Sequence, residues 1–377
     1  MRKRRTILVV LLSLFFVLAI LAIVMGSLWN KPLGPGLGLS EQYSTPVPGS
    51  YASSTAVNLT GQNQVSNPES TPSLSVNSQG NTITVASQAP TRQPLCDGPA
   101  TMTILAIGSD QRGAEYRYGL ADSIHIIRID FAIPNIMVID FPRDLWVEIP
   151  GISDHYGITH AKLNQAYLFG NPGMGYYDGP GEGPGLLART LELNFGLRVD
   201  HYVSVNMQSF VKVINAVGGV DIQVETPIDL NFGDAKPNPK YVFTVGTHHI
   251  DGELALDLAL NRIPTTFQRM KYQKMILAAL REKLLRQDML PKLPKLVAQF
   301  ITSVQTDLSL NDIDSLICIA KAVPKENIKA DSFPQDMFTP SDIFDPYRKV
   351  DTYIYKADFD AIRAMLADFM NGIWPMP

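Results

Sequence analysis

Three apolar runs in the middle of the sequence are flanked by charged residues of the kind that bind phosphate or metal ions. They are Asp110 after residues 101–107, Asp122 before residues 123–129, and Arg143 after residues 136–141. Short apolar runs bounded by Gly and Pro predict buried strands, and charged residues at the ends of such strands often form binding sites. Carboxylates supply hard oxygen ligands, and guanidinium groups bind phosphate through paired hydrogen bonds. The three strand ends therefore predict one shared metal or phosphate site.

Other candidate side chains each have a second, purely structural interpretation. Asp110 and Arg112 are either part of that site or an ordinary surface ion pair, which contributes little free energy. Arg269 and Gln273 are four residues apart on a predicted helix and share one face, which either lines the site or is solvated. Asn164, at the start of another predicted helix, either contacts a ligand or packs. The residues alone leave these alternatives open.

The elements that position these residues alternate between strands and helices. Strands are predicted at residues 101–107, 123–130, 136–141, 202–206 and 220–224, and the second and third form an antiparallel hairpin beside the first. Helices are predicted at residues 186–193, 208–217, 266–287, 309–322 and 358–370, with one more beginning at residue 251. The glycine-rich residues 170–185 lack periodicity and predict a mobile loop. This order predicts a three-layer α/β/α domain with a central mixed sheet.

The beginning of the sequence has the pattern of a membrane anchor. Residues 1–5 form a basic tail, and residues 6–28 contain no charged side chain. A helix of that length spans the roughly 30 Å hydrocarbon core of a bilayer. The alternative is a cleaved signal peptide, but its apolar region is usually about 7–15 residues long. We expect a retained transmembrane helix with the amino terminus in the cytoplasm, because basic residues favour the cytoplasmic side.

Residues 29–95 are rich in Ser, Thr, Pro, Gly and Asn and carry few charges. Such a composition lacks the apolar residues that offset the entropy of ordering a chain. We therefore expect a disordered extracellular tether here and a folded extracytoplasmic domain at residues 96–377. The protein is expected at the cell membrane, with this domain outside the cell.

Net charge and cysteine content narrow the function classes. The formal net charge is −4, which gives no support to nucleic-acid binding. The two cysteines, Cys96 and Cys318, lack the spacing of a zinc site or a catalytic thiol. Outside the cell they are either a disulfide that joins the start of the domain to its carboxy-terminal half or two separate thiols.

The order of motifs in the predicted domain resembles the LytR-CpsA-Psr family, also called cell-envelope-related transcriptional attenuators. The resemblance covers about residues 101–370 and rests on Gly-Ser-Asp-Gln-Arg (108–112), Ala-Asp-Ser (121–123), Phe-Pro-Arg-Asp (141–144), Lys-Leu-Asn-Gln-Ala-Tyr (162–167), Val-Gly-Gly-Val-Asp (217–221) and the pair Arg269 and Gln273. No single motif is decisive, but together, behind a predicted tail, membrane helix and tether, they are specific.

The resemblance implies a phosphotransferase that moves an anionic glycopolymer from a polyprenyl-pyrophosphate carrier to peptidoglycan. It implies Mg²⁺ held by Asp110 and Asp122. It also implies catalytic arginines at Arg143, Arg262 and Arg269, and substrate binding by Arg112, Gln273 and Asn164. A metal ion and several arginines suit a pyrophosphate because its negative charge is concentrated.

The sequence also departs from the family pattern in four places. Leu120, Leu260 and Tyr272 stand where the family usually has arginine, and Thr266 stands where it has aspartate. Each lost hydrogen bond to a charged group costs about 1.5–3 kcal/mol, so two or three losses would weaken substrate binding strongly. An alternative function is therefore a weakened or inactive protein that only binds the lipid-linked or wall polymer. A third is a structural wall protein. The sequence identifies neither the polymer nor its acceptor, and it leaves the oligomeric state open.

Overall fold

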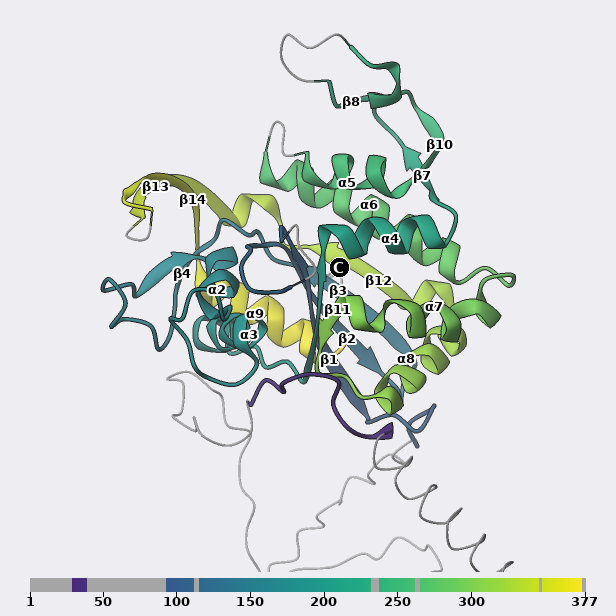
Figure 1. Cartoon of the computed structure of the whole chain (residues 1–377), viewed down its shortest axis with the longest axis horizontal. Coiled ribbons are helices and arrows are strands. Elements are labelled where there is room, and N and C mark those ends of the chain that lie inside the picture. The colour runs from purple at the N-terminus through teal and green to yellow at the C-terminus, as the bar shows by residue number, and fades with distance from the viewer. Residues whose placement is uncertain are drawn as a thin grey trace, which may run out of the picture. The chain divides into compact units, whose positions relative to one another are not determined.

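The computed structural model describes residues 29–38, 93–111, 115–231, 237–261, 265–345 and 348–374 (Figure 1). The predicted basic tail and membrane helix at residues 1–28 lie outside this range, as does most of the predicted tether. Within the described residues no helix has the length and apolar character needed to span a bilayer.

A mixed six-stranded sheet forms the centre of the domain, in the order β11-β6-β1-β2-β3-β12. Its strands are β1 (Thr101–Ser109), β2 (Ala121–Asp130), β3 (Asn135–Asp140), β6 (His201–Asn206), β11 (Val304–Thr306) and β12 (Ile328–Ser332). β2 is antiparallel to both β1 and β3, whereas β6 is parallel to β1 and β12 is parallel to β3. The predicted mixed sheet, with its hairpin beside the first strand, is thus confirmed.

Helices cover both faces of this sheet (Figure 1). On one face, α2 (Leu163–Gly170), α3 (Glu182–Phe195) and α9 (Phe359–Met370) share a core with the strand residues Leu105 and Ile126. On the other face, Met102 and Ile129 belong to a core that includes α8 (Leu310–Ala322). The separation follows from the alternation of side chains along a strand. The three layers agree with the predicted α/β/α architecture.

A helical lobe with a core of its own lies beside the sheet and is drawn above it in Figure 1. It contains α4 (Met207–Ala216), β7 (Val220–Val224), β8 (Ile228–Asp229), β9 (Val242–Phe243), β10 (Gly246–Ile250), α5 (Gly252–Leu260) and α6 (Thr266–Leu284). β7 was predicted at the correct residues, but it pairs with β10 and does not join the central sheet. Asp251 caps α5 and Thr265 caps α6, each through its side chain.

Two small hairpins complete the fold, formed by β4 (Trp146–Glu148) with β5 (His160–Lys162) and by β13 (Phe338–Asp345) with β14 (Val350–Ala357). The backbone N–H of Tyr355 in β14 donates to the carbonyl of Asp144 at 2.9 Å, which attaches the second hairpin to the end of the central sheet. The remaining α-helix among the described residues, α7 (Leu293–Phe300), precedes α8, which begins with a capping box formed by Ser309 and Asp312. Short 3-10 helices lie at Pro239–Tyr241, Leu290–Lys292, Ile301–Ser303, Lys325–Asn327 and Gln335–Met337.

Residues 29–38 differ from the expected tether because they pack on the domain. Leu37 is only 3% exposed and belongs to the core beneath α2 and α3. The N–H of Leu33 donates to the carbonyl of Leu308 at 3.2 Å, and the hydroxyl of Tyr202 donates to the carbonyl of Pro35 at 3.2 Å. Residues 31–38 form no helix or strand, but the side chain of Leu37 and the backbone groups of Leu33 and Pro35 contact the domain.

Two further expectations can be compared with the structure. The predicted mobile loop at residues 170–185 is shorter than expected, because α3 already begins at Glu182 after Gly181, whose φ is 79°. Cys96 and Cys318 form a disulfide with a Cα–Cα distance of 5.7 Å. Of the two alternatives for the cysteines, the structure therefore shows the disulfide.

Candidate functional site

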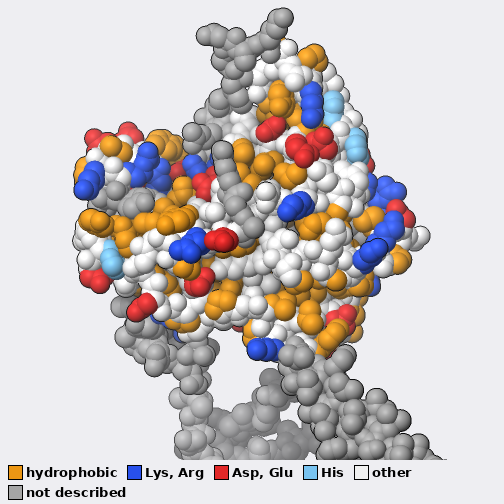
Figure 2. Space-filling model, in the orientation of Figure 1, with side chains coloured by type: hydrophobic (Ala, Val, Ile, Leu, Met, Phe, Trp, Pro, Cys, Tyr) orange, Lys and Arg blue, Asp and Glu red, His pale blue; other side chains and the backbone are white. Residues whose placement is uncertain are grey.

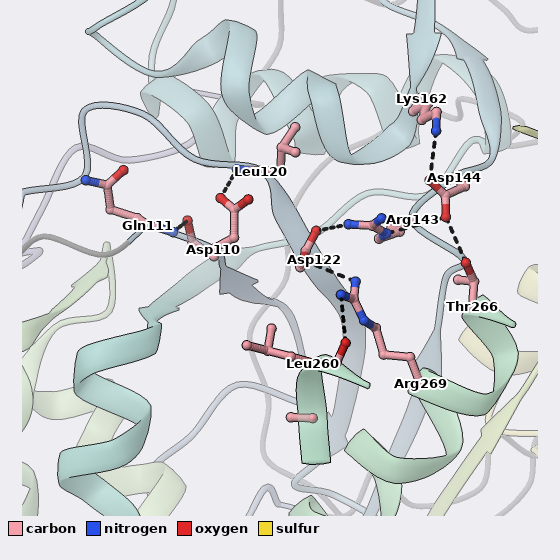
Figure 3. A network of polar contacts seen from close by, with 12 residues as sticks. Asp110, Gln111, Leu120, Asp122, Arg143, Asp144, Lys162, Leu260, Thr266 and Arg269 are labelled. Carbon is pink, nitrogen blue, oxygen red and sulfur yellow. Dashed lines mark hydrogen bonds and ion pairs between the residues drawn. The ribbon is translucent and has the colours of Figure 1, made fainter. Parts of the chain in front are cut away.

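The side chain of Asp122, at the start of β2, binds two arginines (Figure 3). Arg143, just after β3, donates from Nη1 to Asp122 Oδ1. Arg269, in the first turns of α6, donates from Nη1 to Asp122 Oδ2 at 3.1 Å and from Nη2 to the carbonyl of Leu260 at 3.3 Å. Arg269 is 5% exposed. One carboxylate therefore holds two guanidinium groups and joins the sheet to the helical lobe.

A second carboxylate, the buried Asp144, continues this network. Its Oδ1 accepts from Nζ of Lys162 at 3.1 Å, and its Oδ2 accepts from Oγ1 of Thr266 at 2.8 Å. Nε of Arg143 lies 3.4 Å from the same Oδ2. Burial acts to raise the pKa of Asp144, but the charges of Arg143 and Lys162 and these hydrogen bonds outweigh it, so the pKa is lower than usual. Asp144 is therefore ionised and orients both cations.

Asp110 follows β1 and has a different environment. Its Oδ1 accepts from the backbone N–H of Leu120 at 2.6 Å. Burial raises the pKa of Asp110, and the charge of nearby Asp122 adds to the effect, while the Leu120 N–H, Arg143 and Arg269 oppose it. Gly119, with a φ of 109°, brings Leu120 close, since a Cβ there would lie 2.7 Å from Oγ of Ser109. Two carboxylates thus lie close enough for their charges to repel.

These residues line a cavity of about 630 Å³. Its lining comprises Asp110, Leu120, Asp122, Arg143, Asp144, Lys162, Asn164, Gln165, Leu168, Met207, Leu260, Arg269 and Arg348. The side-chain charges of this lining are four positive and three negative, a net of 4 − 3 = +1. The cavity is therefore suited to an anion but nearly neutral by itself.

The predicted site residues are only partly gathered at this cavity. Asp110, Asp122, Arg143, Asn164 and Arg269 line it. Gln273 does not, because its Nε2 donates to the carbonyl of Ala259 at 3.3 Å and so joins α6 to α5. Arg112 and Arg262 lie outside the described residues. Arg269 was assigned either to the site or to a solvated helix face, and the structure places it in the cavity wall.

Asn164 has features of both interpretations that the sequence left open. It is 2% exposed, and its backbone N–H donates to the carbonyl of Arg143 at 3.1 Å, as expected of a packing residue. It also lines the cavity, and no donor among the described residues reaches its Oδ1. A buried acceptor that has no protein donor is available to a ligand.

Several cavity residues were not among the predicted site residues. Asp144, Lys162 and Gln165 all stand inside the recognised motifs at residues 141–144 and 162–167, so a signal existed for each of them. Arg348 belongs to a hairpin for which the sequence showed no motif. Leu120 and Leu260, where the family usually has arginine, give the cavity apolar wall segments.

The donor set of the cavity fits a magnesium ion shared with a ligand. Mg²⁺ commonly uses one or two protein carboxylates and takes its other ligands from water and phosphate. Asp110 and Asp122 provide two such carboxylates, and the repulsion between them would be relieved by a cation. No group of three or more His, Cys, Asp or Glu side chains suitable for a metal occurs in the part of the chain that is described. Both oxygens of Asp122 already accept from arginine, and each retains a lone pair for a metal.

Comparison with protein-family models identifies a match to the LytR_cpsA_psr family over residues 51–367. Among curated proteins, the chain is 29% identical over 219 residues to TagU of Oceanobacillus iheyensis, a polyisoprenyl-teichoic acid–peptidoglycan teichoic acid transferase. It is 27% identical over 212 residues to the regulatory protein MsrR of Staphylococcus aureus. The alignments cover 57% and 55% of this chain, and 62% and 56% of those proteins.

Solved structures with the same fold include TagV of Bacillus subtilis, with a TM-score of 0.55 and 24% identity over 72% of this chain and 97% of that one. The protein gbs0355 of Streptococcus agalactiae also has a TM-score of 0.55, with 22% identity over 72% of this chain and 88% of that one. At these identities the likeness concerns the fold, and it agrees with the mixed sheet and helical layers described above.

Proposed function

The chain belongs to the LytR_cpsA_psr family, as its motifs predicted, and on that premise we propose that it moves an anionic glycopolymer from a polyprenyl-pyrophosphate carrier to peptidoglycan. The observation that carries the proposal is the convergence of Asp110, Asp122, Arg143 and Arg269 on one cavity. The relatives named as teichoic acid transferases support the reaction class.

In the proposed reaction, an acceptor hydroxyl of peptidoglycan attacks the phosphorus atom that carries the glycopolymer. A phosphodiester forms, the bond from that phosphorus to the bridging oxygen breaks, and polyprenyl phosphate leaves with the electron pair. The proton of the attacking hydroxyl is released to water. Negative charge develops on the departing phosphate, where Arg143 and Arg269 donate hydrogen bonds. Because both guanidinium groups are already bound to Asp122, their orientation is set before the substrate arrives.

Asp110 and Asp122 are the residues that would hold Mg²⁺ in this proposal, and the ion would supply neutralisation of the pyrophosphate charge. Lys162 would add a further cation, held in place by Asp144. Oδ1 of Asn164 would accept a hydrogen bond from a hydroxyl of the donor. On the strength of the family motifs alone, Arg262 remains a proposed catalytic residue and Arg112 a proposed substrate contact.

We also propose that residues 6–28 anchor the protein in the cell membrane with the domain outside. The apolar length of this segment and the basic residues before it support the proposal. A tag placed after residue 377 should then be cleaved by protease added to intact cells, and a tag before residue 1 should be protected. The reverse pattern would exclude this topology.

The activity is tested with the full chain in detergent, a polyprenyl-pyrophosphate disaccharide, a peptidoglycan fragment and Mg²⁺, by measuring release of polyprenyl phosphate. Arg143→Gln should lower kcat about 10²–10³-fold, as removal of a donor to a developing charge does. The matched control is Arg128→Gln, since Arg128 is also buried and paired with a neighbouring carboxylate, Asp130, but is outside the cavity. Absence of turnover by the wild type, or equal turnover by the two variants, would exclude the transferase.

A second candidate function is binding of the lipid-linked polymer without turnover. Leu120 and Leu260 favour it, because they line the cavity where the family usually has arginine. In that case the wild type would bind the polyprenyl-pyrophosphate disaccharide in the same preparation, Arg143→Gln would weaken binding, and no polyprenyl phosphate would be released. Turnover that depends on Arg143 excludes this candidate.

A further inference from the structure

The turn between β13 and β14 brings one more cation, Arg348, to the cavity that holds Asp122 and Arg143. In Figure 2 basic side chains are visible in the region where β13 and β14 lie, at the upper left. No family motif includes this hairpin, and no function above depends on it. Arg348 therefore raises the question of what a cation from a separate element does in this site.

A buried carboxylate fixes this turn against the cavity wall. Asp345, at the end of β13, is 0% exposed, and its Oδ2 accepts from Nε2 of Gln165 at 3.1 Å. Its Oδ1 accepts from the backbone N–H of Arg348 at 3.0 Å. Oε1 of Gln165 in turn accepts from the backbone N–H of Lys162 at 2.9 Å. Since a buried carboxylate is stable only when it is hydrogen-bonded, these contacts hold the backbone of Arg348 to the start of α2.

The charge of Arg348 distinguishes it from the other cations of the cavity. Arg143 and Arg269 pair with Asp122, and Lys162 pairs with Asp144. Arg348 donates from Nη1 to the hydroxyl of Thr352 at 3.2 Å, and no carboxylate in the described ranges forms an ion pair with it. The net positive charge of the cavity lining is thus the charge of Arg348, and its guanidinium retains donors for an incoming anion.

Contacts connect Arg348 only indirectly to Asp122, one of the two proposed metal ligands. They run from Asp122 through Arg143, Asp144 and Lys162, then through Gln165 and Asp345 to Arg348, each step being a contact described above. A substrate whose pyrophosphate lies between Asp122 and Lys162 would present a part other than the pyrophosphate to Arg348. In the proposed donor that part is either the glycan or the lipid. A guanidinium is charged and binds polar groups, so it binds the glycan.

We propose that Arg348 is a specificity residue that binds an anionic group, phosphate or carboxylate, of the donor glycopolymer. The inference rests on the proposed function, because it takes the pyrophosphate of the same donor to be bound at Asp122, Arg143 and Arg269. Asp345 and Gln165 are the positioning residues that hold Arg348 for this contact.

The experiment compares two donors with the full chain in detergent. One is a polyprenyl-pyrophosphate disaccharide that carries a glycerol phosphate unit, and the other is the same disaccharide without it. Arg348→Gln should raise KM for the first donor about ten-fold with kcat unchanged, and Arg348→Lys should restore part of the loss. Neither variant should change KM for the second donor. The control Lys349→Gln removes the same charge one residue away, outside the cavity lining, and should behave as wild type with both donors.

Equal KM values for Arg348→Gln and Lys349→Gln with the anionic donor would overturn the inference, as would an equal loss with both donors. Either result leaves the proposed function intact as long as the wild type turns the donors over. If the wild type converts neither donor, the proposed transferase fails and the specificity role fails with it. A third donor, a disaccharide that carries a succinyl group in place of glycerol phosphate, separates carboxylate from phosphate. If Arg348→Gln raises KM for only one of the two anionic donors, the anion of that donor is the one that Arg348 binds.

Discussion

The arrangement of single residues at the cavity centres on Asp122, a carboxylate that carries two arginines. Each guanidinium is held by a charged acceptor, and Arg269 is held by the carbonyl of Leu260 as well. Leaving either arginine buried without Asp122 would be costly, because an unpaired buried charge destabilises a fold by several kcal/mol. The residues of the proposed chemistry are therefore also residues that stabilise the contact between sheet and helical lobe.

Arg269→Lys tests whether the two contacts of the planar guanidinium, to Asp122 and to the Leu260 carbonyl, contribute to turnover and stability. A lysine has a single ammonium group and cannot reach Asp122 and the Leu260 carbonyl with the same geometry. We expect turnover to fall about 10²-fold and the free energy of unfolding to fall by about 1–3 kcal/mol. Arg281→Lys is the control, because Arg281 is on the same helix and forms an ion pair with the adjacent, partly exposed Glu282, and it should change neither quantity appreciably. Similar losses in both variants would show that the effect belongs to the helix and not to the cavity.

Individual site residues were predictable where strand ends carry them. Asp110, Asp122 and Arg143 follow or precede buried strands of one sheet, so pattern alone brings them together. Gln273 shares a helix face with Arg269, yet it lies one turn further along α6, and that turn faces α5. Spacing on a helix predicts a shared face but not where a neighbouring helix begins to cover it. Arg348 was missed because only the folded hairpin brings it to α2.

Whole elements were predicted best where the apolar pattern was long. β1, β2, β3, β6, α4, α6, α8 and α9 occur close to their predicted residues. The edge strands β11 and β12 were missed, since they are short and contain polar residues such as Gln305 and Lys329. The pattern also does not encode pairing partners: residues 220–224 were predicted only as a strand, and the structure shows that this strand, β7, pairs with β10. Residues 29–38 have no periodicity, and their packing depends on a surface that only the folded domain provides.

The contact between β6 and the segment after β11 gives the protein a pH-dependent term in its stability. Nδ1 of His201, in β6, lies 3.5 Å from Oδ1 of Asp307, which also accepts from the backbone N–H of Tyr202. The carboxylate of Asp307 raises the pKa of His201, burial opposes the rise, and the charges of Asp312 and Asp200 add to it. A pKa raised on folding means that the folded state binds the proton more tightly. The stabilisation that proton binding gives the folded state is complete below the pKa of the unfolded state, about 6.5. It is lost as pH rises through the higher pKa of the folded state.

We therefore expect His201→Asn to be less stable than the wild type at pH 6 by about 0.5–1 kcal/mol, and the difference to shrink toward pH 9. Urea unfolding at the two pH values measures it. His160→Asn is the control, because the side chain of His160 is exposed and hydrogen-bonded to the neighbouring Thr159, with no carboxylate among the described residues forming an ion pair with it. A difference that grows with pH would contradict the assigned direction.

At the scale of the molecule, the cavity is formed where three parts of the domain meet. Asp110 and Asp122 come from the sheet, Arg269 and Leu260 from the helical lobe, and Arg348 from the β13–β14 hairpin. Figure 3 shows the first two parts joined through Asp122. The sequence predicted the sheet and the order of helices, but the meeting of these parts depends on long-range packing, which local patterns do not specify.

The disulfide acts on the same scale, since Cys96 and Cys318 are 222 residues apart and connect the start of the domain to α8. A crosslink over so long a loop restricts the unfolded chain strongly, so Cys96→Ser with Cys318→Ser should lower the free energy of unfolding by about 2–5 kcal/mol. The bond lies with the core beneath α8, on the face of the sheet away from α2. Turnover at low temperature should therefore be unchanged in the double variant.

Thermal unfolding of the wild type with and without reductant is the parallel measurement, and the double variant should not respond to reductant. Loss of turnover at a temperature where the double variant remains folded would show that the disulfide also shapes the cavity.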